Sequence, residues 1–214
     1  MRALREIRGL KYPDEFVVRH FFKRGLSDRA GRVQELGCGT GNNLSLYQAW
    51  DWRVAGVDYD AGALADCRFN LGAAAELTQA DLSAGPPAIT GPFDALIIPN
   101  LLCYLTLAQA RALLSGLRAQ LAPGCELFVR TRAIDDYRYG RGVEEEPDGY
   151  RLATPETGEA GLFNRFYTPA GLLDLLTSTL SLEDVTQLAC RFDNVQAGQA
   201  VPGNSDLIVW GRVA

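Results

Sequence analysis

The stretch Val33-Gln34-Glu35-Leu36-Gly37-Cys38-Gly39-Thr40-Gly41 decides the fold of this chain. It includes most of an apolar run at residues 32–36 and leads into a helical pattern at residues 42–50. Alternate glycines let the backbone turn sharply and let a ligand lie against the main chain, where a Cβ atom would collide. The dinucleotide-binding pattern GxGxxG would place its third glycine at position 42, which is Asn42. The spacing therefore disfavours an NAD-linked oxidoreductase.

Short apolar runs alternate with helical patterns along most of the remaining chain. We predict helices over residues 42–50, 60–71 and 106–121, and a further helix that begins at Thr168-Pro169. The predicted strands are residues 32–36, 52–57, 75–79, 93–98, 126–131, 182–187 and 206–213. This alternation is typical of an α/β fold, here a doubly wound, mainly parallel, seven-stranded sheet with helices on both faces.

The length and charge of the chain limit its class. At 214 residues it fits a single domain, residues 1–214. The 21 Lys and Arg against 26 Asp and Glu give a net charge of −5, which divides into +5 over residues 1–32 and −10 over the remainder. A body this acidic makes a poor nucleic-acid binder, because the neutralisation of phosphates supplies most of that affinity.

Histidine, cysteine and apolar patterns exclude further classes. The single histidine, His20, excludes a histidine-rich metal centre, and we predict no metal site. The five cysteines form no CxxC pair, which is typical of reduced thiols in the cytoplasm. The most apolar stretch, residues 95–105, is too short to cross a bilayer. We therefore expect a cytoplasmic protein without a membrane partner.

The glycine turn carries an acidic residue, Glu35, two positions before its first glycine, and in this form it resembles motif I of the class I S-adenosylmethionine-dependent methyltransferases. Later landmarks of that family follow in order. Asp58 ends the second predicted strand, Asp81-Leu82 follow the third, and residues 121–127 (LAPGCEL) are similar to the family's LxPGGxL turn. The resemblance covers residues 33–131. It implies the Rossmann-like methyltransferase fold with S-adenosylmethionine as cofactor.

The same resemblance assigns residues to the cofactor. It implies that Asp58 accepts hydrogen bonds from both ribose hydroxyls and that Tyr59 packs on the adenine. An N-terminal helical lid, residues 1–31, would bring Arg19 to the methionyl carboxylate. The implied cofactor-binding residues are Tyr12, Arg19, Glu35, Gly37, Cys38, Gly39, Gly41, Asp58, Tyr59, Asp81, Leu82 and Pro99. Two interpretations of Glu35 stay open, direct contact with the cofactor and hydrogen bonding to nearby backbone amides.

Candidates for catalysis lie after the fourth predicted strand and in the N-terminal segment. Ligands bind at the carboxyl ends of parallel strands, so residues 99–104 should face the transferred methyl group. Tyr104 stands where many relatives carry a histidine, and two roles fit it: orienting the acceptor or packing on the following helix. His20 is the candidate for a catalytic base, although its neighbours Phe21 and Phe22 also fit a packed histidine.

Residues 133–166 interrupt the alternation, show neither periodicity, and are predicted to form a substrate cap. Their arginines suggest a small, anionic acceptor. The predicted function is transfer of a methyl group to an O, N or S atom of a small molecule by in-line displacement, in a monomer or homodimer. The alternative is a catalytically silent S-adenosylmethionine-binding partner or regulatory protein.

Overall fold

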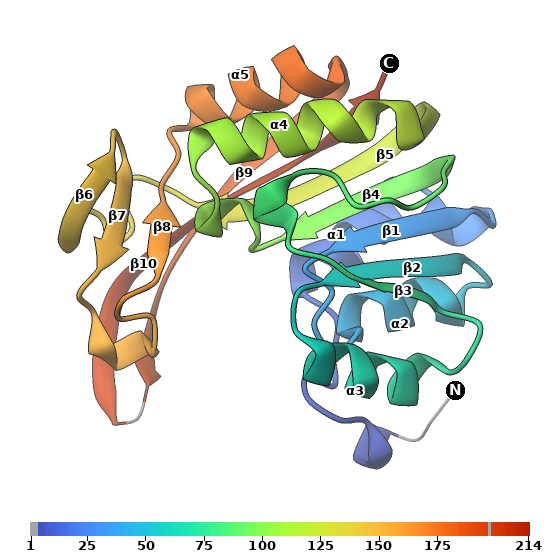
Figure 1. Cartoon of the computed structure of the whole chain (residues 1–214), viewed down its shortest axis with the longest axis horizontal. Helices are drawn as coiled ribbons and strands as arrows, with labels where there is room; N and C mark the ends of the chain where they lie inside the picture. The colour runs from blue at the N-terminus through green and yellow to red at the C-terminus, as the bar shows by residue number, and fades with distance from the viewer. Residues whose placement is uncertain (1–3, 197) are drawn as a thin grey trace.

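The computed structural model describes residues 4–196 and 198–214, which form an α/β structure (Figure 1). The main sheet has seven strands in the order β3-β2-β1-β4-β5-β10-β9, in which only β10 runs antiparallel to its neighbours. These strands are β1 (Arg32–Leu36), β2 (Arg53–Asp58), β3 (Glu76–Gln79), β4 (Phe93–Pro99), β5 (Leu121–Arg132), β9 (Leu182–Gln196) and β10 (Gln199–Val213). The predicted doubly wound, mainly parallel, seven-stranded sheet is confirmed.

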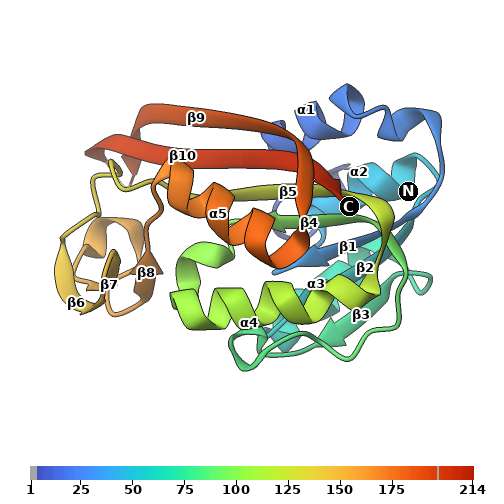
Figure 2. The same cartoon turned by 90° about the horizontal axis from the view of Figure 1, so that it is seen from above.

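Helices cover both faces of this sheet. They are α1 (Glu15–Lys23), α2 (Asn42–Ala49), α3 (Ala61–Leu71), α4 (Leu107–Leu117) and α5 (Pro169–Leu180). α4 and α5 pack on one face, and α1, α2 and α3 pack on the other (Figures 1 and 2). Since the inner strands are buried on both faces, β4 is apolar almost throughout instead of alternating. No helix in the described part of the chain has the length and apolar character needed to span a bilayer.

The strand order brings three turns to one edge of the sheet. β1 lies between β2 and β4 and runs parallel to both. The chain continues from β1 to α2 on one face and from β4 to α4 on the other, so the turns after these strands diverge. Such a switch point leaves a crevice outside the carboxyl ends of the strands, here after Leu36, Asp58 and Pro99.

Side-chain caps start the helices at the predicted positions. Asp60 accepts hydrogen bonds from the amides of Gly62 and Ala63 at 2.7 and 3.2 Å and starts α3. Thr106 and Gln109 each bond to the other's backbone amide, a capping box that starts α4. These caps satisfy amides that have no partner within the helix, and so they fix where each helix begins.

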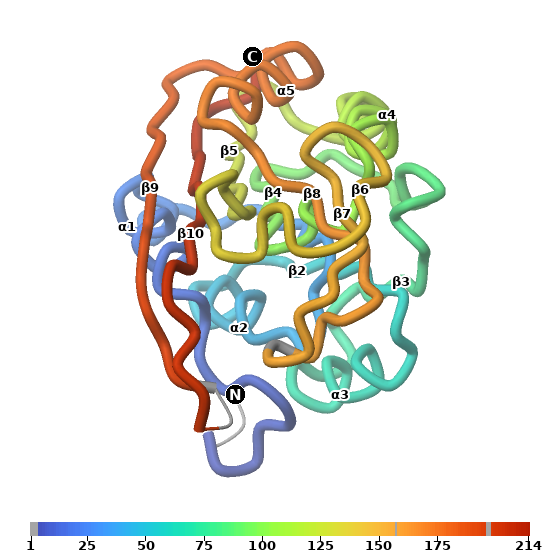
Figure 3. The backbone as a smooth tube through the Cα atoms, turned by 90° about the vertical axis from the view of Figure 1, so that its left-hand side faces the viewer, coloured from blue at the N-terminus to red at the C-terminus, as the bar shows by residue number. Residues whose placement is uncertain are grey.

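The antiparallel part of the sheet differs most from the sequence prediction. The leucine spacing predicted a helix to residue 121, but α4 ends at Leu117. Leu121 is the first residue of β5 and pairs with Phe93 of β4. β9 and β10 have 15 residues each and form one long hairpin, seen along one side of the molecule in Figure 3. Most described β9 side chains are exposed, and the apolar pattern identified only residues 182–187 of β9 and 206–213 of β10.

Residues 133–166, which show no periodicity in the sequence, include a second sheet with the strand order β6-β7-β8. Its antiparallel strands are β6 (Gly142–Glu146), β7 (Gly149–Leu152) and β8 (Phe163–Arg165). The sequence of β6 is Gly-Val-Glu-Glu-Glu. Its consecutive glutamates do not alternate with apolar residues, so the sequence does not indicate a strand here. The two ends of this insertion meet, because Ala133 and Tyr167 form a parallel bridge.

Hydrogen bonds of Glu146 link the small sheet to helix α4 of the main α/β structure. Its carboxylate accepts a hydrogen bond from the Leu107 amide at the start of α4, at 2.9 Å, and another from Arg165 Nη1 at 2.6 Å. The Arg165 side chain is about nine-tenths buried. The neighbouring Glu145 instead pairs with Arg151 at the exposed surface. Glu146 therefore links β6, β8 and α4.

Replacing Glu146→Ala should lower the free energy of unfolding by about 2 kcal/mol, because it leaves the buried Arg165 guanidinium and an α4 amide without their partner. Urea denaturation measures the change. Glu145→Ala is the matched control, since it removes a carboxylate one residue away whose partner Arg151 stays hydrated. Equal losses in the two variants would show that Glu146 does not anchor the insertion.

Candidate functional site

The turn between β1 and α2 is bonded to the end of β2. The amides of its first two residues both donate to Val57 O, at 2.8 and 3.0 Å. Gly37, Gly39 and Gly41 have φ angles of 71°, 50° and 82°, a region that disfavours residues with a Cβ. A Cβ on Gly41 would lie 2.6 Å from Cys67 Sγ, whereas one on Gly39 would meet no atom within 4 Å. Gly41 thus permits close packing, and Gly39 presents bare backbone to open space.

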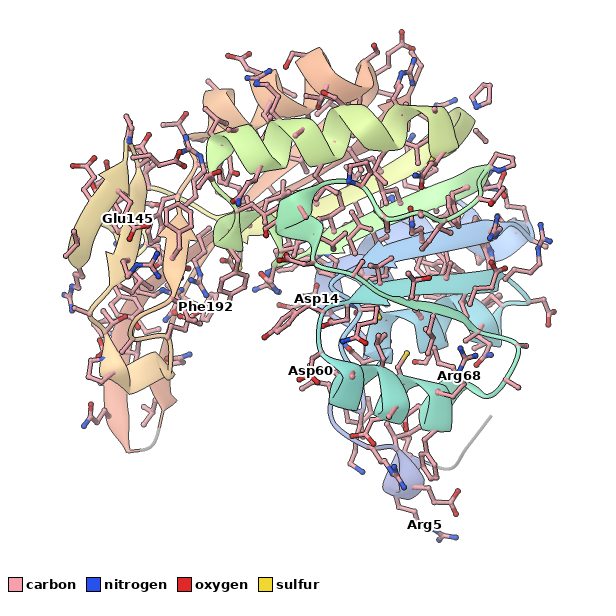
Figure 4. All side chains as sticks on the ribbon, viewed as in Figure 1. Arg5, Asp14, Asp60, Arg68, Glu145 and Phe192 are labelled. Atoms are coloured by element: carbon pink, nitrogen blue, oxygen red, sulfur yellow. The ribbon has the colours of Figure 1, made fainter. Side chains whose placement is uncertain are left out.

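Two cavities meet at this turn. The first, the glycine-turn compartment, has a volume of about 550 Å³, and the second, the Asp58 compartment, has a volume of about 450 Å³. Gly37, Pro99 and Asn100 line both. Figure 4 shows Asp14 at the carboxyl edge of the main sheet and Glu145 across from it on the small sheet. The compartments therefore lie in the crevice that the sheet topology predicts.

Asp58 joins the glycine turn to the end of β2. Its Oδ2 accepts a hydrogen bond from the Gly39 amide at 2.8 Å, and its Oδ1 accepts one from the Asp60 amide at 3.0 Å. The residue is 8% exposed and lines the Asp58 compartment. Each carboxylate oxygen has a second lone pair, so Asp58 can still accept two hydrogen bonds from a ligand.

Glu35 lies at the bottom of the glycine-turn compartment and is 1% exposed. Its Oε1 accepts a hydrogen bond from Asn43 Nδ2 at 2.7 Å, whereas its Oε2 has no partner among the described residues. Burial raises the pKa of Glu35 well above its ordinary value of 4.5, and the Asn43 hydrogen bond opposes this only in part. A cationic ligand would supply the missing partner. Glu35 makes no hydrogen bond to a backbone amide in the described structure.

Most of the predicted cofactor residues line these two compartments. The glycine-turn compartment is lined by Tyr12, Glu35, Gly37, Cys38, Gly39 and Pro99. The Asp58 compartment is lined by Asp58, Tyr59, Asp81, Leu82 and also Tyr104. Tyr59 is 75% exposed, which leaves its ring free to pack on a ligand. Asp81 accepts a hydrogen bond from the Ser83 amide at 2.9 Å, and the hydrogen bonds of Ser83 hold the Asp81 pKa below its ordinary value.

Arg19 and His20 line neither compartment. Arg19 lies on the exposed side of α1. His20 is fully buried, with its ring centroid 5.5 Å from that of Phe128 and 5.9 Å from that of Trp210. Burial, assisted by the charge of Arg24, lowers the pKa of His20 to about 3, so the ring is neutral at pH 7. The histidine belongs to the core beneath α1, and this position corrects its assignment as a catalytic base.

The N-terminal segment reaches the site before α1 begins. Gly9, Leu10, Tyr12 and Asp14 line the glycine-turn compartment, whereas Val17 and Phe21 of α1 are buried against the sheet. Of the predicted lid, residues 1–3 lie outside the described residues; within residues 4–31, residues 9–14 contribute to the compartment and α1 is part of the core.

Tyr104 lies on the insertion side of the Asp58 compartment, in the short helix Leu102–Tyr104. Its hydroxyl donates to Glu159 Oε1 at 2.9 Å. Arg132 also bonds to Glu159, and Arg138 Nη1 donates to Glu159 Oε2 at 2.8 Å. Burial is the main cause that raises the pKa of Tyr104 above its ordinary value, and the phenol stays protonated at neutral pH.

Sequence reasoning did not single out Asp14 and Asn43, which line the glycine-turn compartment, and it included Asn100 only as part of residues 99–104. Asn43 Oδ1 accepts the Asp14 amide at 2.8 Å, which ties the N-terminal segment to α2 and Glu35. Asn100 has a φ of 55°, and its amide donates to Arg130 O at 2.8 Å. The position of Asn43 in the first turn after the glycines was the available signal. Among the described residues no cluster of three or more potential metal ligands occurs.

The chain matches a family model described as "Methyltransferase domain" over residues 33–124. These residues include the glycine turn, Asp58 and Asp81. A protein named trans-aconitate 2-methyltransferase, from Azoarcus sp. (strain BH72), is 31% identical to this chain over 181 residues. That match covers 79% of this chain and 70% of the relative.

Solved structures share the fold at low sequence identity. An S-adenosylmethionine-dependent methyltransferase from Methanosarcina mazei has a TM-score of 0.67 and 16% identity, with 86% of this chain and 92% of that chain covered. A 1,6-didemethyltoxoflavin-N1-methyltransferase from Burkholderia thailandensis, solved with S-adenosylhomocysteine, has a TM-score of 0.63 and 17% identity, with 94% and 80% covered. These two likenesses concern the fold.

Replacing Glu35→Gln should raise the free energy of unfolding relative to that of the wild type, by an amount that grows as the pH rises above 4.5. The Glu35 pKa is higher in the folded protein than in the unfolded chain. As the pH rises from the unfolded to the folded pKa, Glu35 ionises more readily in the unfolded chain, and the free energy of unfolding of the wild type falls. The glutamine variant has no ionisable group at this position, so its stability does not fall in this way. Urea denaturation of both proteins at pH 5 and pH 8 measures the difference. A stability difference that does not change with pH would contradict the raised pKa.

Proposed function

Because the chain belongs to the class I S-adenosylmethionine-dependent methyltransferases and uses S-adenosylmethionine as its cofactor, we propose that it methylates a carboxylate of a small molecule. One observation carries the proposal. In the described lining of the Asp58 compartment, the phenol at the insertion end is committed to Glu159, and the two carboxylates, Asp58 and Asp81, are those that we assign to the cofactor, which leaves no base for the acceptor. The name of the trans-aconitate 2-methyltransferase relative also refers to a carboxylate-bearing substrate.

The described residues fit the cofactor. Asp58 offers its two remaining lone pairs to the ribose diol, and Tyr59 offers an exposed ring to the adenine. Glu35 Oε2, buried and without a partner, accepts the ammonium of the methionyl group. The backbone at Gly39 leaves room for the ligand to lie against the chain. When bound, the cofactor supplies a methyl group that its sulfonium makes electrophilic.

The acceptor end of the site favours a nucleophile that is already deprotonated. An acceptor that carries a proton at pH 7, such as a hydroxyl or an ammonium, needs a base to remove it. The described lining of the Asp58 compartment contains no histidine or lysine, and Tyr104 is held protonated. A carboxylate, with a pKa of roughly 4, needs no base.

The walls of the compartment support in-line displacement on such an acceptor. Leu82, Leu101 and Leu105 give it an apolar side, while Tyr104 marks the polar end. Apolar walls exclude water and leave the acceptor carboxylate weakly solvated, which increases its nucleophilicity. The protein's contribution is then alignment of the acceptor with the methyl group, a positional effect that needs no covalent intermediate.

Replacing Asp58→Ala should weaken S-adenosylmethionine binding by roughly tenfold or more, because two charge-assisted hydrogen bonds to the ribose are lost. Isothermal titration calorimetry measures the dissociation constant. Asp66→Ala serves as the control, since Asp66 lies on α3 and pairs with Arg8 at the exposed surface. Unchanged affinity in the Asp58 variant would show that this carboxylate does not bind the ribose.

The rate of methyl transfer to a carboxylate acceptor should stay level between roughly pH 6 and pH 9, because the acceptor is ionised throughout and no base titrates. Release of S-adenosylhomocysteine measures kcat/KM, and mass spectrometry identifies the methyl ester. The acceptor panel comprises trans-aconitate, citrate, a catechol and a primary amine. Transfer only to the catechol or the amine, or a rate that rises tenfold per pH unit, would overturn the proposed acceptor.

A further inference from the structure

Three hydrogen-bond donors converge on the carboxylate of Glu159. Tyr104 and Arg132 share its Oε1, and Arg138 Nη1 binds its Oε2 at 2.8 Å. Burial alone would raise the pKa of Glu159, but the arginines, assisted by Tyr104, lower it to about 2. The group is thus an ionised carboxylate held on both oxygens by cationic and hydroxyl donors, the arrangement that a free carboxylate ligand would take.

The three donors come from separate parts of the fold, and Arg138 also has a partner other than Glu159. Arg132 is the last residue of β5, and Tyr104 belongs to the short helix after β4. Asp136 holds Arg138 by two hydrogen bonds, from Nε at 2.7 Å and from Nη2 at 2.8 Å. Asp136 in turn accepts the Ser205 amide of β10 at 2.9 Å. Arg138 therefore keeps this partner when the Glu159 carboxylate leaves, while Arg132 and Tyr104 remain within hydrogen-bond distance of each other at 3.5 Å.

Glu159 itself is 8% exposed, but its neighbours in the chain, residues 158 and 160–162, are exposed. Gly158 and Gly161 flank it with φ angles of 72° and 82°, a conformation that glycine adopts without steric cost. Both glycines are exposed, as is Leu162, which lines the Asp58 compartment. Tyr104, which bonds to Glu159, and Leu162, three residues after Glu159, both line the Asp58 compartment, so the donor site borders that compartment.

The charge balance favours replacement of Glu159 by another anion. Arg132 and Arg138 face two carboxylates, Asp136 and Glu159, so loss of Glu159 leaves one buried cationic charge unpaired. An unpaired buried charge is strongly unfavourable until a counter-ion arrives. Arg132 is 8% exposed and its Nη1 is buried without a partner among the described residues, so it has a spare donor for an incoming carboxylate.

We propose that Glu159 is an internal stand-in for the acceptor, and that it occupies the site at which Tyr104, Arg132 and Arg138 bind a substrate carboxylate. The acceptor enters by displacing Glu159 toward solvent, and no bond is made or broken in this exchange. The inference rests on the proposed carboxylate acceptor, and it assigns that acceptor a second anchoring group besides the carboxylate that is methylated.

Calorimetric titration with citrate, in protein saturated with S-adenosylhomocysteine, tests the proposal without turnover. We expect Glu159→Ala to bind citrate at least tenfold more tightly than the wild type, because the competing carboxylate is gone. Glu159→Gln, which keeps the shape without the charge, should show a smaller gain. Glu145→Ala is the control for removal of an exposed carboxylate in the same insertion and should match the wild type.

A second substitution tests whether the tighter citrate binding of the Glu159→Ala protein depends on Arg132. Adding Arg132→Gln to the Glu159→Ala protein should abolish the tighter citrate binding, and thermal melts identify which variants fold. Unchanged citrate affinity in the folded Glu159 variants, or a gain that survives Arg132→Gln, would overturn the proposal. If Glu159→Ala does not fold, the glutamine variant decides alone. Failure of every carboxylate in the methyl-transfer panel would refute the proposed function instead, while the citrate titration still reports on this site.

Discussion

The hydrogen bond from the Gly39 amide to the Asp58 carboxylate is the contact on which the rest of the site depends. It forms only if Gly39 adopts its left-handed conformation and β1 and β2 pair in the observed register, with Leu36 beside Val57. A slip of one residue would turn the strand side chains to the opposite face and carry Asp58 away from the turn. The fold and the cofactor site are thus specified by the same few atoms.

The residues that could be found from the sequence are those whose role is local. The glycine turn, the strand-end carboxylate Asp58 and the helix caps Asp60 and Thr106 each depend on neighbours within a few positions, so their spacing alone identifies them. The positions that escaped prediction depend on distant contacts. β6 and the part of β9 beyond residue 187 are exposed edge strands without an apolar pattern. His20 resembles a catalytic base in isolation, and only the packing of α1 on β5 and β10 shows it to be a core residue.

The two ends of the crevice are built for opposite charges. Glu35, with one oxygen unpartnered, lies at the end suited to a cation, while Arg132 and Arg138 lie beyond Tyr104 at the other end. Methyl transfer from a sulfonium to a carboxylate would neutralise both reacting charges. Reactions of this kind benefit from a site with little water, because water stabilises the separated charges more than it stabilises the transition state. The net charge of −5 therefore says less about function than the placement of these few groups.

The bridge between Ala133 and Tyr167 has an evolutionary consequence. The insertion leaves the main sheet after β5 and returns beside that point before α5. Its length and sequence can therefore vary while β5 keeps its pairing, and the cost in chain entropy of a longer insertion grows only slowly. Substitutions within residues 133–166 can then alter Arg138 and Glu159 of the proposed acceptor site without disturbing the pairing of the main sheet. The glycine turn and Asp58, on the opposite side of the crevice, would be inherited unchanged.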